Sequence, residues 1–408
     1  MKVLHCIIIA LTLFTSTIIV LSGCEYDVAE PQWDVTAYTP PDTIPVINSI
    51  APSQAVPGTN LITIIGENFD LVPDTNIYLE IPFVTTIVPE IIEKTSTSIT
   101  IRRPDLVTDS CYAKVWAHGG LVEKFGPYKI DPVIEAWGSF LENQILGGLD
   151  VDNEENIYVG VGITPFPIVK VTSNGQRSNI TDTTTRAPTG LVVGFDGYLY
   201  LLSTNRVIER INTATGQLSD WHRLSDNRQL RVGAINENGY FFAGGFRTDL
   251  YIIAPDSTSK ASGMYQTSSS AGDTIISARI YNGFLYIAAS GGSGRGIWRH
   301  SIDAGGNLGP KEPVLDLNTI QNFPYINISS FAISSDGKIY IGSSSQISLL
   351  VYDPANNSMD YFYKDIVPPY AKYLVWGNGN YLYMISGNAS PAQTWDCFRI
   401  DMGITSAH

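Results

Sequence analysis

Lysine and arginine are scarce in this sequence. The 408 residues include 25 of them against 39 aspartates and glutamates, which gives a net charge of −14 at pH 7. Because binding to a phosphate backbone needs a basic face, we expect no nucleic-acid partner. Charged residues make up only 16% of the chain, whereas 36 glycines, 23 prolines and 22 tyrosines are present. Tyrosine favours strands, and glycine and proline favour turns, so the composition predicts an all-β protein.

Cysteine and histidine are also few, with four and five residues respectively. Their spacing shows no zinc-binding pattern, so we expect no metal and no cofactor. The chain contains neither a Gly-x-Ser-x-Gly elbow nor a Walker-type loop, and no catalytic residue is predicted. Cys111 and Cys397 fall in different predicted domains, so we expect two separate buried thiols rather than a disulfide.

The only long apolar run lies at the N-terminus. Lys2 precedes it, and it ends in "LSGC", Leu21 to Cys24. These features predict a secretory signal, although the run is also near the length of a transmembrane anchor. "LSGC" resembles the bacterial lipobox, which implies cleavage and lipidation of Cys24. We therefore predict a signal peptide over 1–23, a flexible tether over 24–44, and an exported outer-membrane lipoprotein exposed at the cell surface, with the membrane as partner through Cys24.

Residues 45–131 predict an immunoglobulin-like sandwich. Strands flank the Pro57-Gly58 turn, and the second strand breaks at Gly66. The stretch resembles the IPT/TIG family, whose members in bacterial surface proteins often act as spacers. Trp116 and His118 could line a site, or could be ordinary packing and solvated residues. The resemblance rests on Pro45, Ile47, Ile50, Pro52, Gly58, Ile62, Ile64, Gly66, Asn68 and Phe69, and on the later "TSTSITIRRP".

A recurring phrase dominates the chain beyond Asp131. "SSDGKIYIG", Ser334 to Gly342, has partners in "GFDGYLYLLS", "NENGYFFAGG" and "IYNGFLYIAAS", and looser versions in "DNEENIYVGVG" and "GNGNYLYMISG". Asp-Gly and Asn-Gly pairs adopt the positive φ that tight hairpins need. Successive aromatic anchors are 42, 42, 44, 54 and 43 residues apart, the span of one four-stranded propeller blade: Tyr158, Tyr200, Phe242, Tyr286, Tyr340 and Tyr383.

These repeats predict a six-bladed β-propeller over 132–408, which resembles the NHL type. The fold class is therefore all-β, an IPT/TIG sandwich followed by a propeller. A strand within Pro132–Phe140 precedes the first complete repeat without a partner of its own, so we expect it to pair with the last blade and close the ring. The aromatic anchors occupy one phase of a repeating core, which indicates packing between blades rather than a ligand platform.

Loops that do not repeat supply the candidate binding residues. Variable loops on a rigid scaffold often carry sites, and we place several on the rim opposite the Asp-Gly turns. Guanidinium groups there could receive a carboxylate or sulfate, and aromatic rings could stack on sugars, whereas the alternative is a set of unrelated solvated arginines. The candidates are Phe166, Arg186, Arg231, Arg247, Arg295, Tyr325, Tyr370 and Trp395.

The sequence is compatible with three functions. Its domain order resembles that of glycan-binding surface lipoproteins, and predicts a non-catalytic binding protein whose ligand is a glycan or a surface protein. The second is a propeller enzyme, of the lactonase or polysaccharide lyase type. Gluconolactonase-type propellers carry a channel metal, for which Asp150, Asp152 and Asn143 would be the candidates, but the other inward strands supply few matching acids. The third is a protein-binding scaffold.

Overall fold

The computed structural model describes residues 44–408, apart from 118–121, 142, 226–228, 266–272, 293, 321–322, 324–325, 388–394 and 408. The predicted signal peptide, the lipidation of Cys24 and almost all of the predicted tether lie outside the described residues, as do His118 and Tyr325. Within the described part of the chain, no helix is long and apolar enough to cross a membrane.

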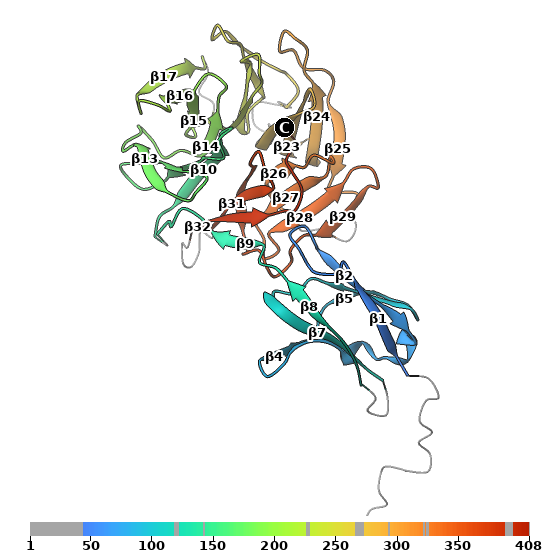
Figure 1. Cartoon of the computed structure of the whole chain (residues 1–408). Coiled ribbons are helices and arrows are strands. Elements are labelled where there is room, and N and C mark those ends of the chain that lie inside the picture. Colours follow the sequence, from blue (N-terminus) through green and yellow to red (C-terminus); the bar gives the residue numbers. More distant parts are fainter. Residues whose placement is uncertain are drawn as a thin grey trace, which may run out of the picture. The chain divides into compact units, whose positions relative to one another are not determined.

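Two four-stranded antiparallel sheets form a sandwich at the start of the described chain (Figure 1). Alternation places Ile62 and Ile64 in the core between the sheets, where both are buried, while Ile65 on the other face of the same strand is exposed. One sheet has the order β1 (Val46–Ala51), β2 (Leu61–Glu67), β6 (Ser98–Arg102), β5 (Ile91–Lys94). The other has the order β4 (Thr85–Ile87), β3 (Ile77–Ile81), β7 (Thr108–Trp116), β8 (Val122–Ile130), and two short 3-10 helices, η1 (Phe69–Leu71) and η2 (Asp74–Asn76), precede β3.

Six further four-stranded sheets in the described part of the chain are the blades of a propeller. The first strands of consecutive blades contact one another around an axis, and the first strand of blade 6 contacts that of blade 1 (Figure 1). Blades 1 to 3 consist of β10 (Leu146–Val151), β11 (Ile157–Val161), β12 (Ile168–Val171), β13 (Arg177–Thr181); β14 (Gly190–Val193), β15 (Tyr198–Leu202), β16 (Val207–Asn212), β17 (Leu218–Arg223); and β18 (Gln229–Ile235), β19 (Phe241–Phe246), β20 (Tyr251–Ile253), β21 (Ser259–Ala261).

Blade 6 takes its outer strand from the opposite end of the propeller sequence. β9 pairs antiparallel with β32, with Glu135 opposite Arg399, so the predicted closure of the ring is confirmed. This pairing covers an edge that would otherwise be exposed. Blades 4 to 6 consist of β22 (Thr274–Tyr281), β23 (Phe284–Gly291), β24 (Gly294–Ser301), β25 (Glu312–Asp316); β26 (Ile328–Ile333), β27 (Ile339–Ser343), β28 (Leu349–Asp353), β29 (Ser358–Tyr361); and β30 (Ala371–Trp376), β31 (Tyr381–Gly387), β32 (Trp395–Asp401), β9 (Ile134–Ala136).

The aromatic anchors lie between blades, as predicted. All six are at most 8% exposed. Tyr158 of blade 1 packs in one cluster with Leu191 and Leu199 of blade 2, and Tyr383 of blade 6 packs with Leu149 of blade 1. Each anchor therefore joins its blade to the next, and the aromatic repeat stabilises the ring.

The hairpin turn at Gly337 explains the glycine of the recurring phrase. Gly337 has φ of +82°, a conformation that side chains with a Cβ rarely adopt. Nothing lies within 4 Å of a Cβ built there, so the glycine is required by backbone conformation and not by crowding. The turn is structural, which agrees with the packing role of Tyr340.

The two cysteines of the described chain are separate thiols. Cys111 lies in the sandwich core and Cys397 in the core between blades 6 and 1, and neither forms a disulfide. Burial raises the pKa of the Cys111 thiol to about 11, so it stays protonated at neutral pH. The expectation of two buried free thiols is confirmed.

Polar contacts join the sandwich to blade 5 and its following loop. The Nη2 atom of Arg102 donates to Oδ1 of Asp360 at 3.0 Å, and the backbone N–H of Gly58 donates to the hydroxyl of Tyr363 at 2.6 Å. The side-chain oxygen of Asn60 accepts from the backbone N–H of Tyr363 at 3.1 Å. Residues 45–408 form one compact unit, and the sandwich is fastened directly to the propeller.

Candidate functional site

A cavity of about 670 Å³ lies where the first strands of the blades begin, around the propeller axis. We call this cavity the cup. Its walls come from blades 2 to 6, and its lining includes Thr189, Arg231, Ile276, Ser329 and Lys372. The volume falls in the range of sites that hold small molecules.

β-Bulges direct the side chains of the cup toward the axis. The pairing of first and second strands skips one residue at Arg231 in blade 3, Ile276 in blade 4, Ser329 in blade 5 and Lys372 in blade 6. A bulge inserts an unpaired residue that bends the strand and re-aims its side chain, and bulges are enriched beside functional sites. All four bulged residues line the cup. The same irregularity recurs in blade 1 within the segment that contains Gly147 and Gly148.

The positions around the cup carry unlike side chains. Arg231, Ser329 and Lys372 each stand eleven residues before the aromatic anchor of their blade, and the same offset leads to Gly147 and Thr189 in blades 1 and 2. In blade 4 the offset to Ile276 is ten residues. We call these six positions the slot residues. They comprise two cations, two hydroxyls, an aliphatic side chain and a glycine.

Hydrogen bonds from Tyr373 and Arg279 join blades that are not neighbours in the ring. The hydroxyl of Tyr373 in blade 6 donates to the carbonyl of Thr189, next to blade 2, at 3.1 Å. Burial raises the pKa of Tyr373 to about 12, so it remains a neutral donor. Further along β22, Nη2 of Arg279 donates to the carbonyl of Leu374 in blade 6. Tyr373, which also lines the cup, therefore links blade 6 to the segment that precedes blade 2.

Lys372 lies among aromatic side chains. Its Nζ atom is 4.1 Å from the ring centroid of Trp395 and 5.3 Å from that of Tyr373. Burial lowers the pKa of the Lys372 ammonium to about 8, so most of the population is charged at neutral pH. No ion pair joins it to a carboxylate among the described residues. Lys372 is thus a partly buried cation. Apart from Arg231, the other described residues that line the cup are uncharged, and the two rings nearest to its Nζ atom are those of Trp395 and Tyr373.

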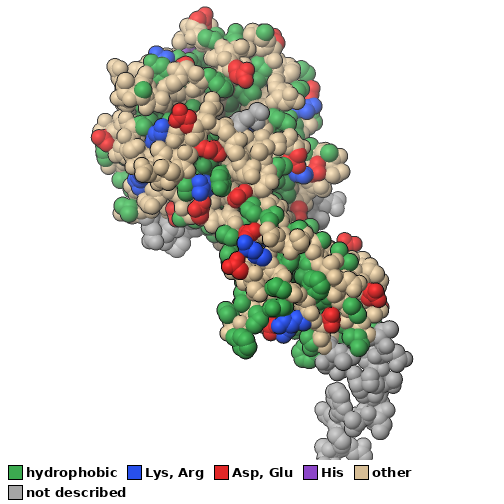
Figure 2. Space-filling view, viewed as in Figure 1, with side chains coloured by type: hydrophobic (Ala, Val, Ile, Leu, Met, Phe, Trp, Pro, Cys, Tyr) green, Lys and Arg blue, Asp and Glu red, His purple; other side chains and the backbone are tan. Residues whose placement is uncertain are grey.

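Arg231 is held against a second aromatic side chain at the wall of the cup. Its guanidinium carbon lies 5.1 Å from the ring centroid of Phe246, and the guanidinium carbon of Arg247 lies equally far from the same ring. Nη2 of Arg231 donates to the side chain of Gln229 at 3.4 Å, whereas its buried Nε atom has no hydrogen-bond partner among the described residues. On the face that Figure 2 shows, basic side chains are few and lie scattered among uncharged ones.

The predicted rim residues divide into two groups. Arg231, Tyr370 and Trp395 line the cup. Arg247 does not line it, but its guanidinium lies over the same Phe246 ring as that of Arg231. Of the other candidates, Phe166, Arg186 and Arg295 are not among the residues that line it. Arg186 is exposed, and both its carbonyl and that of Phe166 accept hydrogen bonds from the Thr184 hydroxyl, while Nη2 of Arg295 donates to the carbonyl of Ile326 at 2.9 Å and Tyr325 lies outside the described residues.

Sequence reasoning overlooked Lys372, Tyr373, Thr189 and Ser329. All four stand near the start of a first strand, whereas the predicted binding residues were assigned to the variable loops. The sequence does contain a signal that identifies these positions. The residue ten or eleven places before each aromatic anchor occupies the same place on every blade.

The candidate channel-metal ligands do not converge. Asp152 accepts hydrogen bonds from the side chains of Asn156 and Tyr158, each at 2.9 Å, and so braces its own hairpin. Asp150 accepts the backbone N–H of Val193 at 2.6 Å, and Asn143 is exposed. No group of three or more histidine, cysteine, aspartate or glutamate side chains among the described residues could hold a metal ion. With Lys372 and Arg231 in the cup, this donor set does not fit a channel cation.

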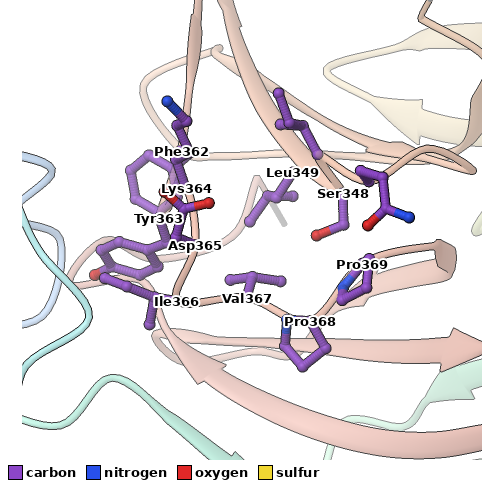
Figure 3. Close-up of a pocket in the computed structure, with 12 residues that line it drawn as sticks. Ser348, Leu349, Phe362, Tyr363, Lys364, Asp365, Ile366, Val367, Pro368 and Pro369 are labelled. Atoms are coloured by element: carbon purple, nitrogen blue, oxygen red, sulfur yellow. The ribbon is translucent and has the colours of Figure 1, made fainter. Parts of the chain in front are cut away.

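A second cavity of about 380 Å³ lies under the loop between β29 and β30 (Figure 3). Its lining combines the apolar side chains of Val367, Pro368 and Leu349 with polar ones such as Ser348 and Asp365. Lys364 at its edge already pairs with a carboxylate of the sandwich, with Nζ 2.6 Å from Oε2 of Glu90. The cup is larger and is lined by bulged residues from four blades, so it is the stronger candidate site.

Comparison with known proteins supports both parts of the fold. Residues 45–128 match the family model of the IPT/TIG domain. The N-terminal module is an IPT/TIG domain. No curated protein matches the chain. The propeller is similar to a calcium-binding regucalcin from Agrobacterium tumefaciens str. C58, with 13% identity and a TM-score of 0.53 over 68% of this chain and 95% of that one.

Two further solved structures resemble the chain. A putative gluconolactonase has 12% identity and a TM-score of 0.51 over 68% of this chain and 94% of that one. An auxiliary nutrient binding protein from Bacteroides ovatus ATCC 8483 has 13% identity and a TM-score of 0.49 over 88% of this chain and 99% of that one. The regucalcin and gluconolactonase matches confirm the propeller fold, and at these identities they concern the fold alone.

Proposed function

We propose that this protein is a membrane-anchored, non-catalytic binding protein of the cell surface that recognises a glycan in the cup. The ring of β-bulges carries the proposal. Four blades each break their strand pairing at the same place, and each break directs a side chain into one recess. A propeller does not need these bulges in order to close, since β14 pairs with β15 without one.

The lining of the cup suits a sugar. Trp395, Tyr370 and Tyr373 offer aromatic rings, and Thr189 and Ser329 are among the hydroxyl residues that can exchange hydrogen bonds with sugar hydroxyls. Aromatic faces present large rigid surfaces, while a few placed polar groups fix the orientation of a ligand. A recess of about 670 Å³ accommodates the end of a glycan and not a long internal stretch.

The N-terminal sequence supports the surface location. The lipobox-like "LSGC" would place an acyl anchor on Cys24, and the polar, proline-rich tether would carry the IPT/TIG domain and the NHL-type propeller away from the membrane. The wild-type protein should incorporate labelled palmitate and lose residues 1–23, whereas a Cys24→Ala variant should remain unlabelled and keep its N-terminal segment. A wild-type protein that takes up no label and keeps this segment would contradict lipidation and favour a transmembrane anchor.

A glycan array probed with the purified full chain tests the binding role. We expect selective binding at micromolar concentration, without release of product when divalent metals are added. Turnover that depends on a metal would instead identify an enzyme, and binding to surface proteins but to no glycan would identify a scaffold. Competition by the bound glycan against chemical labelling of Lys372 would locate the ligand in the cup.

A further inference from the structure

We infer that the cup selects acidic glycans and receives the carboxylate or sulfate of the sugar between Arg231 and Lys372. This inference rests on the proposed glycan-binding function and names the class of ligand. Arg231 comes from blade 3 and Lys372 from blade 6, and both side chains line the same cavity from different sides of the ring.

The charge of the cup is unbalanced. Its described lining residues include these two cations and no aspartate or glutamate. Basic side chains elsewhere in the described chain are commonly paired: Lys114 Nζ lies 2.7 Å from Oε1 of Glu80, and Arg299 Nε lies 2.9 Å from Oε2 of Glu312. Because a partly buried charge without a counterion is costly, the two cations of the cup differ from their neighbours in a way that favours a bound anion.

Aromatic contacts hold both cations without using up their hydrogen-bond donors. The ammonium of Lys372 lies over the face of Trp395, and the guanidinium of Arg231 lies over the face of Phe246. A ring face attracts the positive charge but does not replace a carboxylate oxygen as an acceptor. Among the described residues, the Arg231 guanidinium makes one side-chain hydrogen bond, from Nη2 to Gln229, and a guanidinium has five N–H donors, so donors remain for an anion.

The bulges make this arrangement specific to the cup. In regular strand pairing, side chains alternate between the two faces of a blade, and these faces pack against neighbouring blades. The bulge at Arg231 and the bulge at Lys372 release both residues from this alternation and turn them toward the axis. Two long cationic side chains would otherwise disturb the packing between blades.

The array results provide the first test. We expect the strongest ligands to be carboxylated or sulfated, and neutralisation of the best ligand, by methyl esterification of carboxylates or by desulfation, to weaken binding by about tenfold or more. The two treatments distinguish a carboxylate from a sulfate. Binding should also weaken as salt rises, because exposed charges are screened beyond about 10 Å at 0.1 M.

Substitutions in the cup test which residues confer the preference for acidic ligands. Lys372→Met and Arg231→Gln should each remove most of the preference for the acidic ligand over its neutralised form, and Lys372→Arg should restore it. Lys170→Met is the matched control. Lys170 lies on β12, away from the cup, and its Nζ atom is 5.8 Å from the ring centroid of Tyr158. It should bind as the wild type does.

The possible outcomes separate this inference from the proposed function. Equal binding of an acidic glycan and its neutralised form, unchanged in both cup variants, would overturn the acidic selectivity and leave glycan binding intact. If no glycan binds, thermal titration with sodium sulfate and sodium acetate decides. Stabilisation that is lost in Lys372→Met and Arg231→Gln would support an anion-binding cup and contradict the glycan, and no stabilisation would overturn both.

Discussion

The Lys372→Met substitution should stabilise the fold while it impairs ligand binding. Burial lowers the pKa of Lys372 from 10.5 to about 8, so the charged form is disfavoured in the folded protein. Since a shift of one pKa unit corresponds to about 1.4 kcal/mol, the charge costs at most about 3.5 kcal/mol of unfolding free energy at pH 7. Lys372 remains partly open to solvent, and we expect a gain of about 1–2 kcal/mol.

The unfolding free energy that Lys372→Met gains over the wild type should fall as pH rises. At pH 7 both the folded and the unfolded chain hold the proton of Lys372, so the full cost is present. Between pH 8 and 10.5 the folded protein releases the proton while the unfolded chain still holds it, so the wild type becomes relatively more stable as pH rises. The difference between the wild type and Lys372→Met should therefore be largest near pH 7 and shrink toward pH 10.

Thermal unfolding followed by circular dichroism measures this difference. In a compact unit that spans residues 45–408, about 1–2 kcal/mol corresponds to a rise in Tm of roughly 1–3 °C at pH 7. The Lys170→Met variant controls for the loss of a lysine beside an aromatic ring. Two results would refute the conclusion that the buried charge of Lys372 destabilises the folded protein. One is a lower Tm for Lys372→Met at pH 7, and the other is a rise in Tm of equal size at pH 7 and pH 10.

Three further outcomes follow from the geometry. Gly245→Ala should lower stability by about 1–3 kcal/mol and abolish ligand binding, because a Cβ there would overlap the carbonyl of β18 beside the Arg231 bulge; a wild-type Tm and titration would argue against a tightly fixed bulge. The affinity for an acidic ligand should fall above about pH 8 as Lys372 loses its proton, while Tyr373, whose pKa is about 12, stays neutral; an unchanged affinity to pH 10 would exclude Lys372 from binding. Arg102→Ala should cost about 2–3 kcal/mol and split the calorimetric transition into separate sandwich and propeller components, since Arg102 is 6% exposed and pairs with Asp360; one unchanged transition would show that this pair does not couple them.

The sequence predicted the ring because packing repeats. Each blade must present an aromatic residue to the next blade at the same depth, and this requirement leaves a regular spacing that is visible without coordinates, as at Tyr340 and Tyr383. Closure by β9 was predictable for a related reason, since an unpaired strand beside an open edge has one favourable place to go.

The cup was harder to predict because it depends on irregularity. Strand periodicity places every second residue on the same face of a blade, and a single inserted residue reverses this assignment. Arg231 was selected as a rim residue and does line the cup, but Arg295, selected by the same reasoning, donates to the backbone of Ile326. Lys372 lies in a segment that reads as an ordinary apolar strand, so nothing in its immediate surroundings marked it.

Comparison of the blades with one another separates the two kinds of position. At the anchor position all six blades carry tyrosine or phenylalanine, because each must fill the same space between neighbours. At the slot position, about eleven residues earlier, glycine, threonine, arginine, isoleucine, serine and lysine stand in equivalent places. Packing would favour similar residues there too, whereas an asymmetric ligand on the axis contacts each blade differently. The diversity of the slot residues, within a ring that otherwise repeats, is what a site for one oriented ligand requires.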